Sequence, residues 1–229
     1  MKIHRFIGDF DLTQSSVLIR DPGVAKQMRS VLKLHTGEKI ILSNGRGEEA
    51  LCELGGYGRD SVSVTVLEQR KNEAEPTSQI ILYCSILKRE NFEWVVQKAT
   101  EVGVKEIIPI MSRRTVKLNL NTDRLERITK EASEQSGRGV VPTIHQPVPF
   151  EEALEHAQTN SINILLDSSG KLVKKKDSRG STGLFIGPEG GWDEAELALA
   201  QERGASVMSL GTLTLRAETA AIIASYLFV

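Results

Sequence analysis

The chain has little cysteine, no long apolar run and no excess of charge of either sign. Cys52 and Cys84 are its only cysteines among 229 residues, and they lie far apart and match no metal-ligand spacing. We therefore expect two reduced, structural thiols in a cytoplasmic protein and no metal site. No run of 18 apolar residues occurs, and no hydrophobic region follows the first basic residues, so we expect neither a membrane span nor a signal peptide.

The charges of the chain nearly cancel. Its 29 Lys and Arg residues stand against 30 Asp and Glu residues, which gives a formal net charge of −1. This balance excludes a strongly basic nucleic-acid-binding protein, so any RNA contact must use a local patch. One such patch lies between positions 105 and 139, where 8 basic residues stand against 5 acidic ones.

A polar stretch with a proline, residues 70–78, separates two patterns of secondary structure. Before it, short strands around one expected helix at 22–34 predict a small β-barrel. After it, apolar strands alternate with helical segments, which predicts an α/β domain with a mostly parallel sheet covered on both faces. The sequence thus predicts two domains, residues 1–72 and 73–229. The expected strands are 3–7, 16–20, 39–43, 49–54, 61–67, 80–86, 106–110, 162–167, 183–186 and 206–210, and the later helices are 92–102, 122–137, 150–158, 193–203 and 217–228.

The first informative motif is a glycine loop that follows an expected strand and reads Gly-Pro-Glu-Gly-Gly-Trp at 187–192. Its glycines permit positive φ angles or the close approach of a ligand. It lacks the Gly-Lys-Ser/Thr of a phosphate loop, and Glu189 adds a negative charge, so phosphate binding is disfavoured. A neutral or cationic ligand fits better, and S-adenosylmethionine, with its adenine and sulfonium, is of this kind. Trp192 either lines such a pocket or anchors the loop by packing.

A second motif repeats this arrangement about twenty residues later. Residues 210–220 read Leu-Gly-Thr-Leu-Thr-Leu-Arg-Ala-Glu-Thr-Ala, again a loop between an expected strand and an expected helix. In α/β proteins, ligands bind at the carboxyl ends of the strands. The two loops therefore predict one shared ligand site.

Together with Lys88 and the segments 97–103 and 134–138, these motifs resemble the RsmE-type small-subunit (16S) ribosomal RNA uracil-N3 methyltransferases of the SPOUT superfamily. The resemblance covers nearly the whole chain. It implies S-adenosylmethionine-dependent methylation of N3 of a uridine in 16S ribosomal RNA, and a homodimer in which each site borrows from its neighbour. It also implies a PUA-like RNA-binding domain at 1–72 and a SPOUT methyltransferase domain with a trefoil knot at 73–229.

The resemblance also assigns positions around the cofactor. Leu166, at the end of an apolar strand, is a further candidate for the pocket wall, although a strand leucine belongs by default to the core. The full set of expected cofactor residues is Leu166, Gly187, Glu189, Gly190, Gly191, Leu210, Gly211 and Leu215.

Arg216 and Glu218 are the expected catalytic residues. Methylation at N3 requires that the imide proton be removed and that the developing anion be stabilised. Arg216 suits the uracil oxygens or a phosphate, and Glu218 suits the role of base or of orienting group. The alternative is that the two side chains pair with each other and that Glu218 only favours the helix terminus.

Four arginines are candidates for RNA contacts, because the planar guanidinium suits phosphates and base edges. They are Arg5 and Arg29 in the first domain and Arg114 and Arg138 in the second. Lys117 and the lysine tract 174–176 are weaker candidates. The alternative for each is a solvated basic surface.

Two other functions remain open from the residues alone. The chain could methylate a different RNA nucleotide, because nothing in the motifs encodes which base is read. It could also be a non-catalytic RNA-binding ribosome assembly factor that has kept the fold. The intact Gly190, Gly191 and Arg216 argue against the second alternative.

Overall fold

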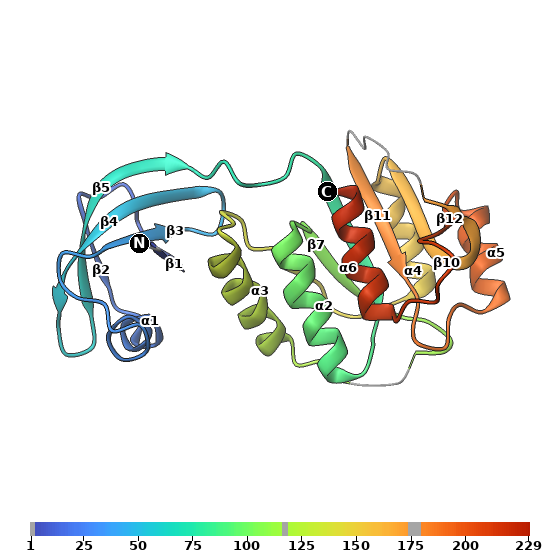
Figure 1. Cartoon of the computed structure of the whole chain (residues 1–229), viewed down its shortest axis with the longest axis horizontal. Coiled ribbons are helices and arrows are strands. Elements are labelled where there is room, and N and C mark those ends of the chain that lie inside the picture. Colours follow the sequence, from blue (N-terminus) through green and yellow to red (C-terminus); the bar gives the residue numbers. More distant parts are fainter. Residues whose placement is uncertain (1–2, 116–118, 174–179) are drawn as a thin grey trace. The chain divides into compact units, whose positions relative to one another are not determined.

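The computed structural model describes residues 3–115, 119–173 and 180–229, which form two compact units (Figure 1). The N-terminal unit comprises residues up to 75 together with 133–141, and the C-terminal unit comprises 76–132 and 142–229. The sequence did not predict that the short segment 133–141 would belong with the first unit. Lys117 and the tract 174–176 lie outside the described residues.

The N-terminal unit is a five-stranded sheet in the order β1-β3-β4-β5-β2. The β1–β3 pair is parallel, and the other pairs are antiparallel. The alternation along β5 buries Val62 and Val64 and exposes Ser63, so one face of the sheet covers a core. The strands are β1 (His4–Ile7), β2 (Ser16–Ile19), β3 (Lys39–Ser43), β4 (Glu48–Tyr57) and β5 (Val62–Lys71).

One short helical segment packs into this core. The helix α1 (Pro22–Lys26) begins after Asp21, whose side chain accepts hydrogen bonds from two backbone N–H groups, with proline at the first position. It continues as one π-helical turn, η1 (Gln27–Val31). The expected helix at 22–34 is therefore too long. Lys33 has a φ of 53°, which a right-handed helix cannot include.

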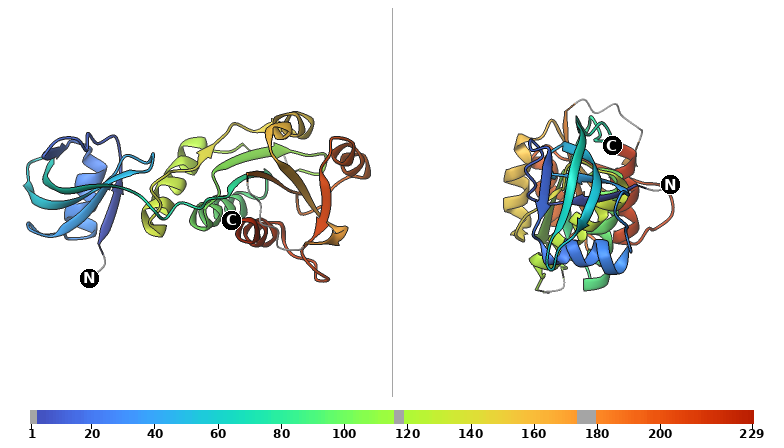
Figure 2. Two further views of the ribbon diagram at one scale, coloured as in Figure 1. Left: turned by 90° about the horizontal axis from the view of Figure 1, so that it is seen from above. Right: turned by 90° about the vertical axis from the view of Figure 1, so that its left-hand side faces the viewer.

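The C-terminal unit is built on a parallel sheet in the order β12-β10-β11-β6-β7-β8, with β9 paired to β7. Every pairing in it is parallel. Alternate residues of β6 enter different cores. Leu82 and Cys84 pack with α2 and α6 on one face, and Ile81 and Tyr83 pack with α4 and α5 on the other. The helices thus cover both faces, as the sequence predicted (Figure 2).

The bounds of these elements follow the expected pattern with a few additions. The two-residue strands β8 and β9 were not expected, because so short a strand leaves no alternation in the sequence. Among the described helices, none is long and apolar enough to span a membrane. The elements are β6 (Gln79–Ser85), α2 (Arg89–Val102), β7 (Glu106–Met111), α3 (Thr122–Ser136), β8 (Thr143–Ile144), β9 (Val148–Pro149), α4 (Phe150–His156), η2 (Ala157–Thr159), β10 (Ile162–Leu172), β11 (Ser181–Ile186), α5 (Glu194–Glu202), β12 (Ser206–Ser209) and α6 (Ala217–Phe228).

Strand β10 departs most from expectation, because it runs on to Leu172. Its pairing with β12 shifts register, so that Leu166 and Lys171 both align with Met208. Gly170 lies against the Met208 backbone, where a Cβ would come within 2.6 Å. The residues between 166 and 171 therefore have no partners in β12, and this interruption follows Leu166, which accepts a hydrogen bond from Trp192 of the first glycine loop. The trefoil knot that the resemblance implies stays a prediction.

Candidate active site

Both glycine loops border one cavity at the carboxyl edge of the parallel sheet. The strands β10, β11 and β12 are neighbours, so the loops that follow them leave the same edge. The cavity has a volume of about 580 Å³ and lies within the C-terminal unit. The two loops thus share one site, as their arrangement predicted. The walls are formed by Lys88, Asn91, residues 166–168, 186–189, 191–192, 209–211, 213–218 and 220.

The cavity gathers nearly all of the residues that the sequence assigned to the cofactor and to catalysis. Arg216 and Glu218 both line it. Gly190 is the exception, because it lies against Arg114 on the outside of the loop. Leu166 is buried in the core and also borders the cavity, so it combines the two roles that were weighed for it. The cofactor candidates in the walls are Leu166, Gly187, Glu189, Gly191, Leu210, Gly211 and Leu215.

Sequence reasoning missed part of the wall. Asp167 and Ser168 line the cavity directly after the point where β10 leaves its first register. Asn91, near the start of α2, lines it as well. A polar pair at the end of an apolar strand is a signal that could have identified the first two, because ligands bind at such strand ends.

The first glycine loop is shaped by a buried tryptophan. Trp192 donates its Nε1–H to the carbonyl oxygen of Leu166 at 3.0 Å. A Cβ on Gly187 would lie 3.0 Å from the indole ring, so any larger residue there would have to displace the ring. Gly191 has a φ of 68°, and its N–H donates to the Pro188 carbonyl at 2.9 Å, which closes the turn. Trp192 is therefore a packing anchor that also contributes to the wall.

Arg216 and Glu218 differ sharply in exposure although they are two residues apart. Arg216 precedes the first turn of α6, and its side chain is 84% exposed. Glu218 lies in that turn, and its side chain is 4% exposed. Their closest charged atoms, Arg216 Nη1 and Glu218 Oε1, are 3.9 Å apart, which is an ion pair too long to include a hydrogen bond. The local pairing considered as the alternative thus exists only as a long contact.

One oxygen of Glu218 has no partner among the residues that the structure describes. Its Oε2 is buried, and no hydrogen bond reaches it from any residue that the structure describes. An unpaired buried carboxylate oxygen destabilises a fold by a few kcal/mol. The helix N-terminus offsets part of this cost. The Glu218 side chain lines the cavity, so this buried carboxylate contributes negative charge to the cavity wall.

Glu189 and Glu218 bring negative charge to the cavity wall. Burial raises the pKa of the Cys84 thiol, and the charges of Glu189 and Glu218 raise this pKa further. The cavity wall also holds the cations Lys88 and Arg216. The arrangement therefore suits a ligand that carries both polar groups and a positive charge.

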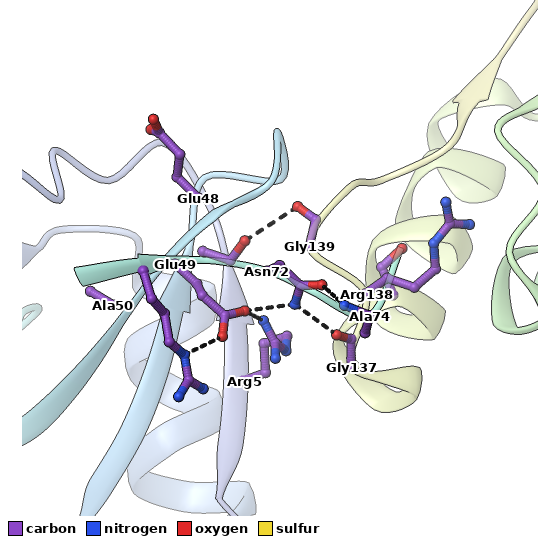
Figure 3. Close-up of polar contacts among 12 residues, drawn as sticks. Arg5, Glu48, Glu49, Ala50, Asn72, Ala74, Gly137, Arg138 and Gly139 are labelled. Atoms are coloured by element: carbon purple, nitrogen blue, oxygen red, sulfur yellow. Dashed lines mark hydrogen bonds and ion pairs between the residues drawn. The ribbon is translucent and has the colours of Figure 1, made fainter. Parts of the chain in front are cut away.

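Two of the arginines expected to contact RNA, Arg5 and Arg138, form ion pairs inside the N-terminal unit. Arg5 pairs with the buried carboxylate of Glu49, which also accepts from Arg70 at 2.8 Å and from Asn72 at 2.7 Å (Figure 3). Asn72 in turn donates to the carbonyl of Gly137 at 3.1 Å. This network ties the segment 133–141 to the sheet, and it gives Arg5 a structural role.

Arg138 is equally engaged. Its side chain is 5% exposed, and its Nη2 donates to Glu75 at 2.9 Å. The other oxygen of Glu75 accepts from the backbone N–H groups of Gly139 and Val140, each at 3.0 Å. Burial of this pair counts against a direct phosphate contact by Arg138.

The remaining two arginines are exposed. Arg29 lies over the ring of Tyr57, with 4.8 Å between its Cζ and the ring centroid, and it donates to the carbonyl of Gly58. Arg114 lies in the C-terminal unit and contacts the first glycine loop rather than open solvent alone. In the described part of the chain, no group of three or more His, Cys, Asp or Glu side chains is placed to hold a metal ion.

Comparison with known proteins agrees with this architecture. Residues 73–228 match the RNA methyltransferase domain family, and residues 28–67 match the RNA methyltransferase PUA domain. The ribosomal RNA small subunit methyltransferase E of Mesomycoplasma hyopneumoniae is 32% identical over 169 residues, which cover 71% of this chain and 74% of the relative. Its counterpart from Bacillus subtilis is 30% identical over 211 residues, with coverage of 85% and 82%.

A solved structure shows the same fold. The crystal structure of ribosomal RNA small subunit methyltransferase E from Neisseria gonorrhoeae, bound to S-adenosyl methionine, has a TM-score of 0.89 to this chain at 28% identity. The match covers 98% of this chain and 95% of that one. Because the domain match spans 73–228 and the relatives align over most of the chain, this protein belongs to the RNA methyltransferase family that includes the small-subunit ribosomal RNA methyltransferases E.

Proposed function

We propose that this protein methylates N3 of a uridine in 16S ribosomal RNA of the small subunit, with S-adenosylmethionine as the methyl donor. The free buried oxygen of Glu218 carries the proposal, because it lies in the wall of a cavity that both glycine loops enclose. The names of the relatives and the S-adenosyl methionine bound to the Neisseria gonorrhoeae protein support the donor and the RNA.

The residues of the cavity fit such a donor. A volume of about 580 Å³ is in the range of small-molecule sites. Leu166, Leu210 and Leu215 offer an apolar wall, and Gly187 and Gly191 line the cavity beside it. When bound, S-adenosylmethionine supplies a methyl group on a positively charged sulfonium. The cofactor residues proposed here are Leu166, Gly187, Glu189, Gly191, Leu210, Gly211 and Leu215, with Gly190 shaping the loop from outside.

Glu218 and Arg216 have complementary roles toward the uracil. Glu218, whose carboxylate has an oxygen without a partner among the described residues, accepts the proton of the N3–H group or holds that group in line. Arg216 stabilises the negative charge that develops on the uracil oxygens, and its exposure leaves the guanidinium free to meet RNA that arrives from solvent. The long contact between the two keeps Arg216 near the carboxylate without occupying it.

RNA contacts in the N-terminal unit are assigned to Arg29. Its guanidinium stacks on Tyr57 and lies at the surface, and this arrangement of an arginine on an aromatic ring also suits an unpaired base. The burial of Arg5 and Arg138 leaves them a supporting role for this unit. We place the protein in the cytoplasm, where its ribosomal RNA would be.

A homodimer is part of the proposal. Ile223 and Tyr226 on α6 are exposed apolar side chains, and so is Trp94 on the neighbouring helix α2. Exposed apolar groups of this size mark interaction surfaces when they are contiguous. Light scattering on the purified protein tests this, with twice the 25.2 kDa chain mass expected.

The function is tested by incubating the protein with small-subunit RNA and a methyl-labelled donor. After digestion to nucleosides, mass spectrometry should find the label in 3-methyluridine at one position. Label in another nucleoside would replace the proposed target, and no transfer to free RNA or to assembled subunits would contradict an enzymatic role.

A further inference from the structure

A turn that follows β7 lies against the first glycine loop. In this turn, Ser112 N–H donates to Thr115 Oγ1 at 3.0 Å, and Thr115 N–H donates to the Ser112 carbonyl at 3.1 Å. The Ser112 hydroxyl also lies 3.2 Å from the hydroxyl of Ser85, at the end of the neighbouring strand β6. The turn is thus fixed at both ends, and it presents Arg113 and Arg114 from a defined backbone position.

Arg114 contacts the one residue of the first loop that does not line the cavity. Its Nη1 donates to the carbonyl oxygen of Gly190 at 2.9 Å. A Cβ added to Gly190 would lie 3.3 Å from Arg114 Cβ and 3.4 Å from Arg114 Cδ, so the arginine stem packs directly on the glycine. The guanidinium and the stem therefore hold the outside of the loop whose inside borders the cavity.

Arg113 contacts the start of α5, just after the same loop. Its N–H donates to Glu196 Oε1 at 2.8 Å, and its Nη1 donates to Asp193 Oδ1 at 2.9 Å. Asp193 and Glu196 are also the two members of the capping box that begins α5. The side chain of Arg113 thus reaches the start of α5, where Arg114 Nη2 makes only a longer contact, 3.9 Å from Asp193 Oδ2.

We infer that Arg114 is a positioning residue for the methyl-donor site, acting on the carbonyl of Gly190, and that it is not an RNA contact. The inference rests on the proposed function, because it assigns the cavity to the donor. Of the carbonyls in the loop, that of Pro188 is engaged by Gly191 and that of Gly190 by Arg114. One bond within the loop and one from Arg114 thus fix the turn, and removal of the arginine frees its Gly190 end.

The sequence places two arginines side by side, and this offers a charge-matched control. Arg113 and Arg114 have side chains that are 62% and 51% exposed, so each substitution removes one positive charge from the same surface. If the pair served RNA, both substitutions would weaken RNA binding to a similar degree. Only the positioning role makes the two variants differ in donor binding.

The test compares Arg114→Met with Arg113→Met, because methionine keeps an unbranched stem and removes the guanidinium. S-adenosylmethionine is titrated calorimetrically into each variant, and the Kd of small-subunit RNA is measured at saturating donor. For Arg114→Met we expect a donor Kd about tenfold above that of the wild type, since a hydrogen bond from a charged group is lost. For Arg113→Met we expect a change of less than about threefold.

The converse pattern overturns the inference, namely an unchanged donor Kd for Arg114→Met with weakened RNA binding. Equal losses of donor affinity in both variants overturn it too, because they would indicate a general effect on the turn. Gly190→Ala offers a second check. If the two residues act through one contact, its loss of donor affinity should not add to that of Arg114→Met, and full additivity contradicts the shared contact. If the wild-type protein does not bind the donor at all, this result contradicts the proposed function rather than the role of Arg114.

Discussion

Two buried glutamates, one in each unit, show opposite ways of placing a carboxylate inside this protein. Glu49 in the N-terminal unit is 3% exposed, and Glu218 in the C-terminal unit is equally buried. Glu49 accepts from Arg5, Arg70 and Asn72, so both of its oxygens are satisfied. Glu218 keeps one oxygen without a partner among the described residues.

This difference fits a structural role for Glu49 and the catalytic role proposed for Glu218. A buried charge with all of its donors in place is costly to disrupt, because removing one member leaves the others unpaired. Leaving an oxygen unpaired costs stability, and proteins retain such a cost mainly where a ligand or a reaction uses the group. The burial of the two side chains is the same, so their partners decide their roles.

Glu49→Gln should have the largest effect on stability. The substitution keeps the shape and removes the charge that Arg5 and Arg70 share, so we expect the N-terminal unit to lose about 3 kcal/mol. Hydrogen exchange of the amides in β4 and β5 measures this loss in the unit concerned. Protection equal to that of the wild type would show that the network contributes little.

The matched substitution Glu218→Gln should do the reverse. Because it removes a buried charge with no full partner, we expect unfolding stability to stay within about 0.5 kcal/mol of the wild type or to rise. We expect turnover to fall about 100-fold, as for the loss of a general base or an orienting group. A destabilised protein with normal turnover would contradict this prediction, because Glu218 would then have a structural role like that of Glu49.

Arg216→Ala should lower turnover by about 30-fold, since a charged hydrogen bond to the developing anion would be lost. The donor Kd should change much less, and stability should not change, because the side chain is exposed. Single-turnover rates with calorimetric donor titrations separate the two effects. Unchanged turnover would remove Arg216 from the reaction.

The two glutamates were not equally predictable from the sequence. Glu218 stands in a local motif, and the strand, loop and helix around it formed as expected, with α6 running from Ala217 to Phe228. The partners of Glu49 lie 44, 21 and 23 residues away, and no local pattern links such positions. The same limit explains why Arg138, 63 residues from Glu75, was expected to face RNA and is instead buried in an ion pair.

In the candidate active site, too, local features could be predicted from the sequence and contacts between distant residues could not. The shared cavity could be predicted, because parallel strands bring their following loops to one edge. The contact of Arg114 with Gly190 spans 76 residues and depends on where the turn after β7 falls, so the sequence suggested only a basic patch. The continuation of β10 to Leu172 also escaped prediction, since its register shift follows from packing against β12 rather than from alternation.

Acid should weaken the N-terminal unit through Glu49. Burial alone would raise the pKa of this carboxyl, but the hydrogen bonds from Arg5, Asn72 and Arg70 outweigh it and hold the pKa below the ordinary value of 4.5. A depressed pKa contributes stability that is complete above the ordinary value and is lost as the pH falls through the lowered one. The difference in stability between wild type and Glu49→Gln should therefore shrink below about pH 4.5. A constant difference down to pH 3 would contradict the network.

Arg29→Ala should give the smallest effect. Loss of the stacked guanidinium should weaken RNA binding a few-fold and leave donor binding unchanged. Measuring affinity at several salt concentrations sharpens the result. RNA affinity should fall steeply with salt, whereas donor affinity should not. The slope of log RNA affinity against log salt concentration should be smaller by about one for the variant. An unchanged slope would indicate that RNA does not contact Arg29.

The most direct test of the central claim, that the cavity beside Glu218 holds the methyl donor, is calorimetric titration of the purified protein with S-adenosylmethionine and, in parallel, with ATP. The account predicts saturable binding of S-adenosylmethionine and no binding of ATP. Binding of neither ligand, or equal binding of both, would contradict it.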